Sequence, residues 1–233
     1  MRHEWALARA RRCPRRTHVT AVTHQTEVTA PPLSARGEQS RQRILRAATE
    51  VLAETGELEV ASVALRAKVS DGLPYRYFGT KSGLLSAVVD DFQQRLAKAV
   101  VYRDFVGATW QQREQQRVSA WVRFLFSEPV APVMLAGLGG DATVAASWQQ
   151  RLSLAVEMGA RNITRGRRDG DLPAGADPTI LATAVLGGVQ AGVAAALASK
   201  PRPDQAKVAR SLWHFVRGAV EYKVAKHSKD ADD

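Results

Sequence analysis

The sequence has only one cysteine, Cys13, in 233 residues. A single thiol excludes an intrachain disulfide bond and a zinc site built from cysteines, and it fits a reducing compartment. The first residues are positively charged, but no apolar run follows them, so we expect no signal peptide and a cytoplasmic protein. The same arginine-rich, acid-poor start also fits a transit peptide, which is kept as an alternative.

Aromatic residues are also scarce, at 6% of the chain, whereas alanine is abundant. This composition favours the packing of helices over that of a sheet. The length allows one large or two small domains and a substantial core. We therefore expect an all-α protein.

The motifs of common enzyme classes are absent as well. The sequence contains no HExxH, no GxSxG, no P-loop and no complete GxGxxG. Three of the five histidines lie before residue 38, and His214 and His227 have no histidine or cysteine near them in the sequence. We therefore predict no catalytic residues, no metal site and no cofactor.

The net charge of +10 is unevenly distributed. Residues 1–37 carry seven arginines against two acidic residues and have no apolar periodicity, which predicts a disordered basic extension. Such an extension either has no function or is a basic arm that adds non-specific affinity for DNA. Residues 38–81 carry seven basic and six acidic side chains, so this part is nearly neutral.

Residues 60–81 have the spacing of a helix-turn-helix. Val63, Ala64 and Ala67 give a short helix one apolar stripe, and Ser70 is placed to cap a second helix. That second helix is rich in tyrosine and basic residues, which suit a phosphate surface. A helix from Glu38 to Thr55 precedes this unit, and a long helix from Lys81 to about Val100 follows it.

The run Gly72-Leu-Pro-Tyr-Arg-Tyr-Phe78, with Ile44-Leu-Arg-Ala-Ala48, Val69-Ser70 and Lys81 before Leu84-Leu85, resembles the tetracycline-repressor (TetR) family of transcription regulators. The resemblance covers roughly residues 39–89, and the rest of the chain is similar only in its helical layout. It implies a helix-turn-helix DNA-binding domain at 38–83, a helical ligand-binding and dimerisation domain at 84–226, and a disordered tail at 227–233.

The DNA-contacting candidates lie in and after the turn. Ser70 and the free amides of Asp71 and Gly72 can meet a phosphate at a helix N-terminus. The resemblance implies that Tyr75, Tyr77 and Lys81 contact the phosphate backbone, and it places Arg76 to reach a base or a phosphate. Lys68 is a further candidate, and Phe78 is expected in the core. Val60, Lys68 and Pro74 depart from the family pattern, so the operator sequence cannot be predicted, and Lys68 at a position that favours glycine carries strain.

The second half of the chain contains a group of large apolar residues separated by glycine and proline breaks. Such residues are usually core, but as a group they are also typical of a mostly apolar cavity. The candidates for lining it are Trp110, Trp121, Phe124, Met134, Leu138, Trp148, Leu152 and Met158, together with Phe126. Arg123, Gln149 and Arg161 are candidates for its polar contacts.

Residues 180–199 carry no charge, which fits either a membrane helix or a buried helix with a close neighbour. We favour the buried helix, because its many small residues contribute little insertion energy. An amphipathic helix follows at 204–226. By the resemblance these two helices form the dimer interface, with Gly188, Gly192, Leu212, Phe215 and Val216 as candidates.

The sequence therefore predicts a homodimeric regulator that binds a palindromic operator in double-stranded DNA and is released by a small-molecule effector, hence a repressor. One alternative is the same architecture acting as an activator or without a small molecule. Another is a membrane-associated helical protein that uses residues 180–199.

Overall fold

The computed structural model describes residues 34–137 and 142–222. All regular structure in these residues is helical, which confirms the predicted fold class. The elements in chain order are α1 (Ala35–Thr55), α2 (Val60–Ala67), α3 (Gly72–Phe78), α4 (Lys81–Leu96), the π-turn η1 (Ala97–Val101), α5 (Trp110–Ser127), α6 (Ala131–Ala136), α7 (Ala142–Arg168), α8 (Pro178–Ala198) and α9 (Gln205–Glu221).

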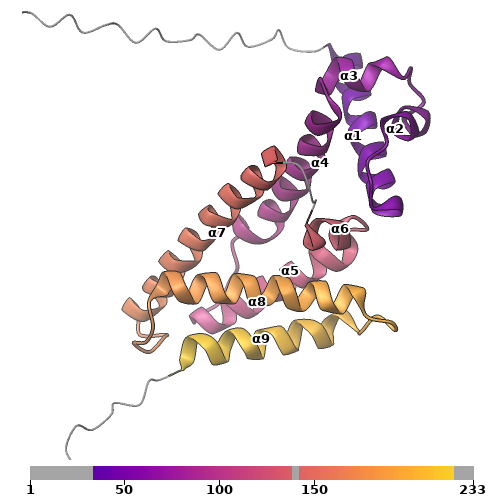
Figure 1. Cartoon of the computed structure of the whole chain (residues 1–233). Helices are drawn as coiled ribbons and strands as arrows, with labels where there is room; N and C mark the ends of the chain where they lie inside the picture. The colour runs from indigo at the N-terminus through magenta and orange to yellow at the C-terminus, as the bar shows by residue number, and fades with distance from the viewer. Residues whose placement is uncertain (1–33, 138–141, 223–233) are drawn as a thin grey trace, which may run out of the picture.

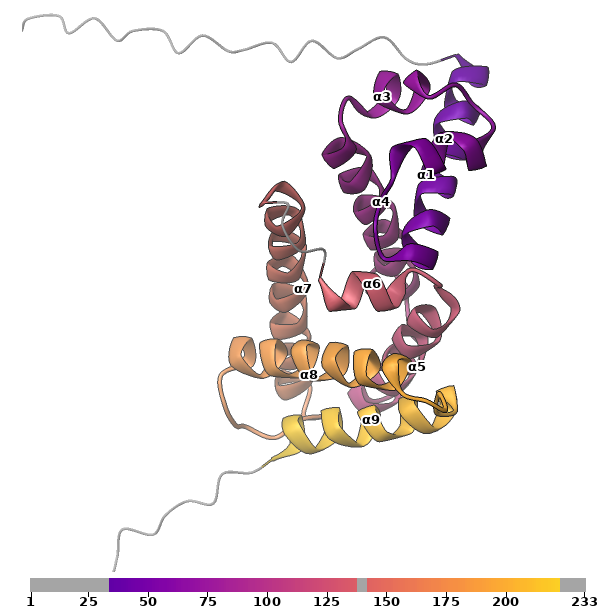
Figure 2. The same cartoon turned by 45° about the vertical axis from the view of Figure 1, so that its right-hand side comes forward.

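Helices α1 to α3 form a head at one end of the molecule, and α8 and α9 lie side by side at the other end (Figures 1 and 2). Helix α4 runs from the head into the body. Helix α5 packs along α9, and α7 packs across α8. The head and the helices that are predicted to pair with a second subunit are therefore far apart on the same chain.

Helix α1 begins three residues earlier than the sequence predicted. Ser34 is its N-cap, and the Ser34 hydroxyl accepts a hydrogen bond from the Gly37 amide at 3.2 Å. The predicted extension therefore stops before residue 34, and residues 1–33 lie outside the described part of the chain. The helix ends at Gly56, whose φ of 76° is the left-handed conformation expected of a terminating glycine.

Helix α4 buries Leu84, Val88, Val89 and Phe92 on the predicted apolar stripe. It ends at Leu96, however, and the predicted helix to about Val100 is wrong in its last turn. There the Tyr102 amide donates to the Ala97 carbonyl at 2.9 Å, which closes a π-turn. The apolar pattern continues through this turn, so the sequence carried no sign of it.

The ends of the last helices follow capping chemistry. Asp177 accepts hydrogen bonds from the Thr179 and Ile180 amides at 2.8 and 3.0 Å, with Pro178 at the first helical position. Asp204 caps α9 in the same way through the Lys207 amide at 2.8 Å. Helix α7 ends at Arg168, with Arg165, Arg167 and Arg168 in its last turn.

Candidate DNA interface and ligand cavity

The turn between α2 and α3 is built around Lys68, which has a φ of 53°. Its amide bonds to the Ala64 and Leu65 carbonyls and closes α2, and the Val69 amide also donates to the Ala64 carbonyl at 3.1 Å. Lys68 therefore has the left-handed conformation that was predicted for it, because it stands at a position that favours glycine. Its side chain is exposed.

The N-cap of α3 lies one residue later than the predicted cap, Ser70. Asp71 occupies the N-cap position without a side-chain cap bond, and Ser70 contributes its backbone carbonyl, which accepts from the Leu73 amide at 3.0 Å. The prediction that the Ser70 hydroxyl caps the helix is therefore wrong. Pro74 is buried at the third helical position, where its missing amide removes no intrahelical bond.

The candidate DNA residues share one property, which is exposure. Seven of the eight predicted residues are exposed, namely Lys68, Ser70, Asp71, Gly72, Tyr75, Arg76 and Lys81. Tyr77 differs, because it is partly buried against the core. Phe78 is also partly buried, and the Arg41 guanidinium lies 5.3 Å from its ring centroid. Helix α3 lies at the free end of the head (Figure 2), and the turn and α3 expose polar and basic residues.

Two features that the sequence analysis missed hold this surface in place. Gly83 is in the first turn of α4 and lies close to the end of α3. A Cβ on Gly83 would be 2.1 Å from the Phe78 carbonyl oxygen. On the other side, Arg66 of α2 makes a two-pronged hydrogen bond to Glu54 of α1, at 2.7 and 2.5 Å. This bond holds the pKa of the Glu54 carboxyl below its usual value. Both contacts are tertiary, so only the fold reveals them.

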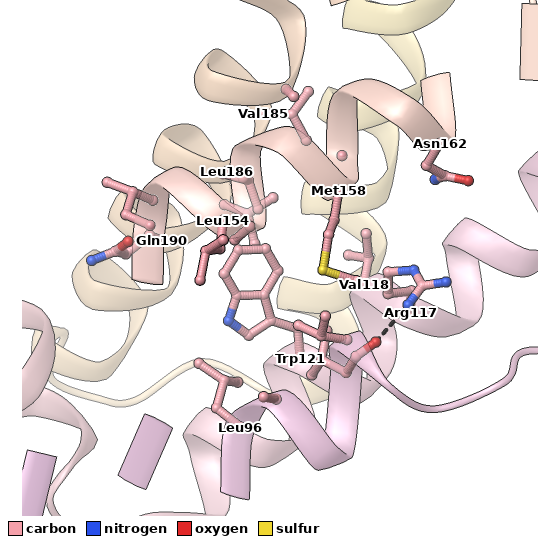
Figure 3. A pocket seen from close by; sticks show the side chains of 18 of the residues that line it. Leu96, Arg117, Val118, Trp121, Leu154, Met158, Asn162, Val185, Leu186 and Gln190 are labelled. Atoms are coloured by element: carbon pink, nitrogen blue, oxygen red, sulfur yellow. Dashed lines mark hydrogen bonds between the residues drawn. The ribbon is translucent and has the colours of Figure 1, made fainter. Parts of the chain in front are cut away.

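The body contains a cavity of about 450 Å³, which lies within the size range of small-molecule sites. Its walls come from α4 and η1, α5, α7, α8 and the inner side of α9. Five predicted residues line it, namely Trp110, Trp121, Trp148, Leu152 and Met158, and Arg161 lines it as well. In Figure 3, Trp121 and Met158 lie next to each other, with Leu186 of α8 nearby.

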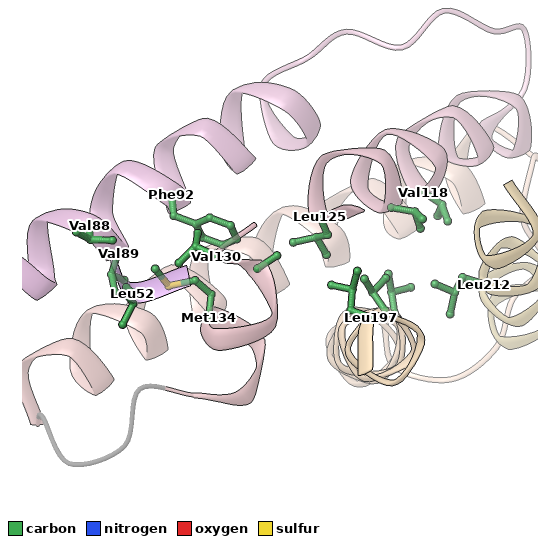
Figure 4. Packing of buried hydrophobic residues seen from close by; sticks show 14 of the residues in the cluster. Leu52, Val88, Val89, Phe92, Val118, Leu125, Val130, Met134, Leu197 and Leu212 are labelled. Atoms are coloured by element: carbon green, nitrogen blue, oxygen red, sulfur yellow. The ribbon is translucent and has the colours of Figure 1, made fainter. Parts of the chain in front are cut away.

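Three predicted lining residues, Phe124, Phe126 and Met134, lie elsewhere, and a fourth falls outside the described residues. Phe126 is partly buried against the core. Phe124 packs on Phe92, with ring centroids 5.5 Å apart, under the Arg95 guanidinium. Met134 is 2% exposed and packs beside Val130 and Phe92 where α6 meets α4 (Figure 4). Leu138 lies outside the described part of the chain. Aromatic and methionine side chains fill cores and cavities alike, which is why composition did not separate the two.

The polar lining is largely different from the predicted one, because Arg123 and Gln149 do not line the cavity. Its polar residues include Glu114 and Arg117 of α5 and Asn162 of α7. A signal for them exists in the sequence. Trp110, Glu114, Arg117 and Trp121 follow one another at helical spacing on one face of α5, and the tryptophans at both ends of this series mark the face.

Most of the residues predicted to form the dimer interface pack against other residues of the same chain. A Cβ on Gly188 would lie 2.6 Å from the Phe215 ring, and one on Gly192 would lie 2.6 Å from Leu212 Cδ2. Leu212 and Val216 are buried, and Val216 reaches the cavity wall. The two glycines therefore bring α8 close to α9 of the same chain, and their predicted part in a dimer contact stays a prediction. Phe215 remains 43% exposed.

The family model described as "Bacterial regulatory proteins, tetR family" matches residues 44–88, from α1 into α4. A putative TetR-family transcriptional regulator from Rhodococcus sp. matches the fold with a TM-score of 0.68, over 78% of this chain and 98% of that one, at 19% identity. The chain therefore carries a TetR-family DNA-binding segment, and it has the fold of TetR-family structures. The transcriptional regulator FadR from Bacillus subtilis, in complex with stearoyl-CoA, matches the fold with a TM-score of 0.64 at 19% identity, over 77% of this chain and 99% of that one.

The curated relatives are HTH-type transcriptional regulators. The HTH-type transcriptional repressor Rv3405c of Mycobacterium tuberculosis is 40% identical over 63 residues, which are 26% of this chain and 34% of the relative. The HTH-type transcriptional regulator BetI of Escherichia coli is 36% identical over 90 residues, 38% of this chain and 45% of the relative. The chain spans less than half the length of either relative, so these matches say little about the cavity.

Helix α8 is apolar enough to need a covering partner. Within the described residues it is the one helix that has the length and composition to cross a membrane, with a mean hydropathy of 1.9. In the TetR-family fold it packs against α7, α9, α6 and α5. Its outward stripe is nevertheless exposed and carries no charge, and it consists of Ile180, Thr183, Ala184, Gly187, Ala191 and Ala195.

Proposed function

We propose that this TetR-family chain is a DNA-binding transcriptional repressor that works as a homodimer in the cytoplasm. The observation that carries the proposal is the exposed set of polar and basic residues on the turn and α3, within the segment that matches the family. A B-DNA major groove admits one helix. In this proposal α3 enters the groove, Tyr75 and Lys81 bind phosphates, and Arg76 reads a base.

The exposed stripe of α8 supports a twofold dimer. A stripe of small apolar residues allows the same helix of a second chain to approach closely, and a twofold interface needs a surface that complements itself. Phe215 lies on the neighbouring helix α9 and is partly free to join the interface. Two such chains present two copies of α3, which predicts an inverted-repeat operator with half-sites about 34 Å apart or a small multiple of this distance.

Helix α4 supports a link between ligand and DNA, because it takes part in both sites. Its N-terminus abuts α3 through Gly83 and Phe78, and Phe92, Gln93 and Leu96 near its other end line the cavity. A ligand that tilts α4 would change the separation of the two α3 helices, which DNA holds fixed. Couplings of this kind are typically about 1–3 kcal/mol. That FadR was solved with stearoyl-CoA supports a ligand role for this fold.

The proposal is tested by selecting bound sequences from random DNA and then measuring variants on the selected site. Arg76→Ala should relax one position by about 1–3 kcal/mol, whereas Lys81→Ala should weaken binding to all sequences alike. Lys207→Ala is the matched control, because Lys207 is an exposed lysine on α9 at the opposite end of the molecule. Selected DNA without an inverted repeat would contradict the dimer, and a reporter gene placed behind the site distinguishes repression from activation.

A further inference from the structure

Polar groups line both ends of the cavity, but three of the four arginines in its described lining lie at one end, which is its polar end. Where the start of α5 meets the end of α7, the lining contains Arg117, Asn162, Arg161 and Arg165. The other end is walled by Trp121, Trp148, Leu152, Leu186 and Val189, and its polar groups are Gln93, Gln190 and Arg151. Figure 3 shows this division, with Arg117 and Asn162 on one side of Met158 and Leu96, Leu154 and Leu186 on the other.

Trp110 adds an unused hydrogen-bond donor to the lining. This side chain is 3% exposed, and its indole N–H has no acceptor among the residues that the structure describes. It lies at the polar end, because the neighbouring ring atom Cδ1 would be 2.8 Å from a Cβ on Gly166, near the end of α7. Buried indole N–H groups usually have a partner, so this one is a candidate to donate to a bound molecule.

The charges at the polar end favour an anion over a cation. Glu114 is the one acidic residue in the part of the lining that the structure describes, and both of its carboxylate oxygens lie 3.1 Å from Arg117 Nε, so its charge is neutralised within the protein. Arg161 is paired at 3.7 Å with Glu157, which does not line the cavity. Arg165 has no acidic partner among the described residues. The polar end therefore keeps an excess of positive charge.

We propose that the cavity binds an amphiphile with one apolar chain and one anionic head group, of the kind represented by a fatty-acid carboxylate. The apolar chain lies against Trp121, Leu152 and Leu186. The head group lies at Asn162 and Arg165, within reach of the guanidinium of Arg117. This proposal rests on the proposed function, because it names the chemical class of the effector that would release DNA.

The test compares three probes that share one chain and differ in the charge of the head group: dodecanoate, dodecanol and dodecyltrimethylammonium. Each is titrated into the full-length protein below the concentration at which it forms micelles. Binding is followed by calorimetry and by the fluorescence of Trp110, Trp121 and Trp148. Dodecanoate should bind about tenfold more tightly than dodecanol, because only its carboxylate is a charged acceptor of hydrogen bonds from the polar end. The cation should bind most weakly.

Variants then locate the head group. Arg165→Gln and Asn162→Leu should each weaken dodecanoate binding several-fold and leave dodecanol binding unchanged. Arg168→Gln is the matched control, because Arg168 is an exposed arginine in the last turn of the same helix and does not line the cavity. Equal binding of dodecanoate and dodecanol, tighter binding of the cation, or no effect of either variant would each overturn the proposal.

DNA affinity is measured in the same samples, so that the two proposals can fail separately. If the protein binds its selected DNA and none of the probes binds, the ligand class is wrong and the proposed DNA-binding function stands. If dodecanoate binds as described and the chain selects no DNA, the cavity assignment stands and the proposed function fails.

Discussion

Gly83 lies so close to Phe78 that the Phe78 carbonyl oxygen occupies the space a side chain on Gly83 would need, 2.1 Å from the Cβ position. The contact joins the first turn of α4 to the last residue of α3. Because the blocking atom belongs to the backbone, it cannot move aside without moving α3. The orientation of α3 relative to α4 therefore depends on this glycine.

Gly83→Ala should lower the free energy of unfolding by about 1–3 kcal/mol, the usual cost of overpacking, and should weaken DNA binding. Chemical denaturation and DNA titration measure the two effects. Gly72→Ala is the control for replacing a glycine in the same head. A Cβ on Gly72 would meet nothing within 4 Å, so this variant should fold at least as stably. Equal stability of the two variants would show that α3 adjusts freely.

Lys68→Gly should raise the free energy of unfolding by up to about 1 kcal/mol, because glycine adopts the left-handed conformation without a steric penalty. Lys68→Ala keeps that penalty and removes the same charge. If Lys68 binds a phosphate, both variants should lose similar DNA affinity, while only the glycine variant gains stability. Thermal unfolding and the salt dependence of DNA binding distinguish the two contributions.

Gly187→Glu should convert the proposed dimer to monomers without unfolding the chain. A Cβ on Gly187 would point into open space, so the glutamate fits the monomer but places a charge in the apolar stripe of α8. Analytical ultracentrifugation measures the dissociation. Gly188→Leu, one residue further on, should instead disturb the packing of α8 on α9 and lower the stability of the monomer itself. A Gly187→Glu protein that remains dimeric would place the interface elsewhere.

Arg151 ties the cavity wall to α4, since its Nη2 donates to Asp90 Oδ1 at 2.8 Å. The pair is partly exposed, so Arg151→Gln should change stability by less than about 1 kcal/mol. The ligand-induced change in DNA affinity should fall by about 0.5–2 kcal/mol, because α7 would no longer pull on α4. Arg217→Gln, which breaks an ion pair within α9, should leave this coupling unchanged.

The head was largely predictable because its signals are local. The apolar stripe of α1 repeats along a single helix, and the left-handed conformation of Lys68 follows from the resemblance of the short α2–α3 turn to the family pattern. The contacts of Gly83 with Phe78 and of Arg66 with Glu54 join different helices. No pattern within one helix indicates which other helix will approach it.

The cavity was predictable only in part, because burial and cavity lining select the same residue types. Trp121 and Met134 look alike in sequence, yet one faces the cavity and the other fills the core between α4 and α6. In the same way, the spacing of Gly188 and Gly192 predicted a close helix neighbour correctly. It contained no information on whether that neighbour belongs to the same chain or to a second one.

The π-turn at Ala97–Val101 forms part of one cavity wall, and this part of the wall can be altered by inserting or deleting a residue. A π-turn contains one residue more than an α-helical turn, and each α-helical residue advances the helix by about 100°. Deleting one residue here would restore an α-helical turn and shift by one position which of Val100, Val101 and Tyr102, all of which line the cavity, occupies each place on the wall. Insertions and deletions at this point would therefore change which side chains meet the bound molecule, while the helix that leads to α3 keeps its phase.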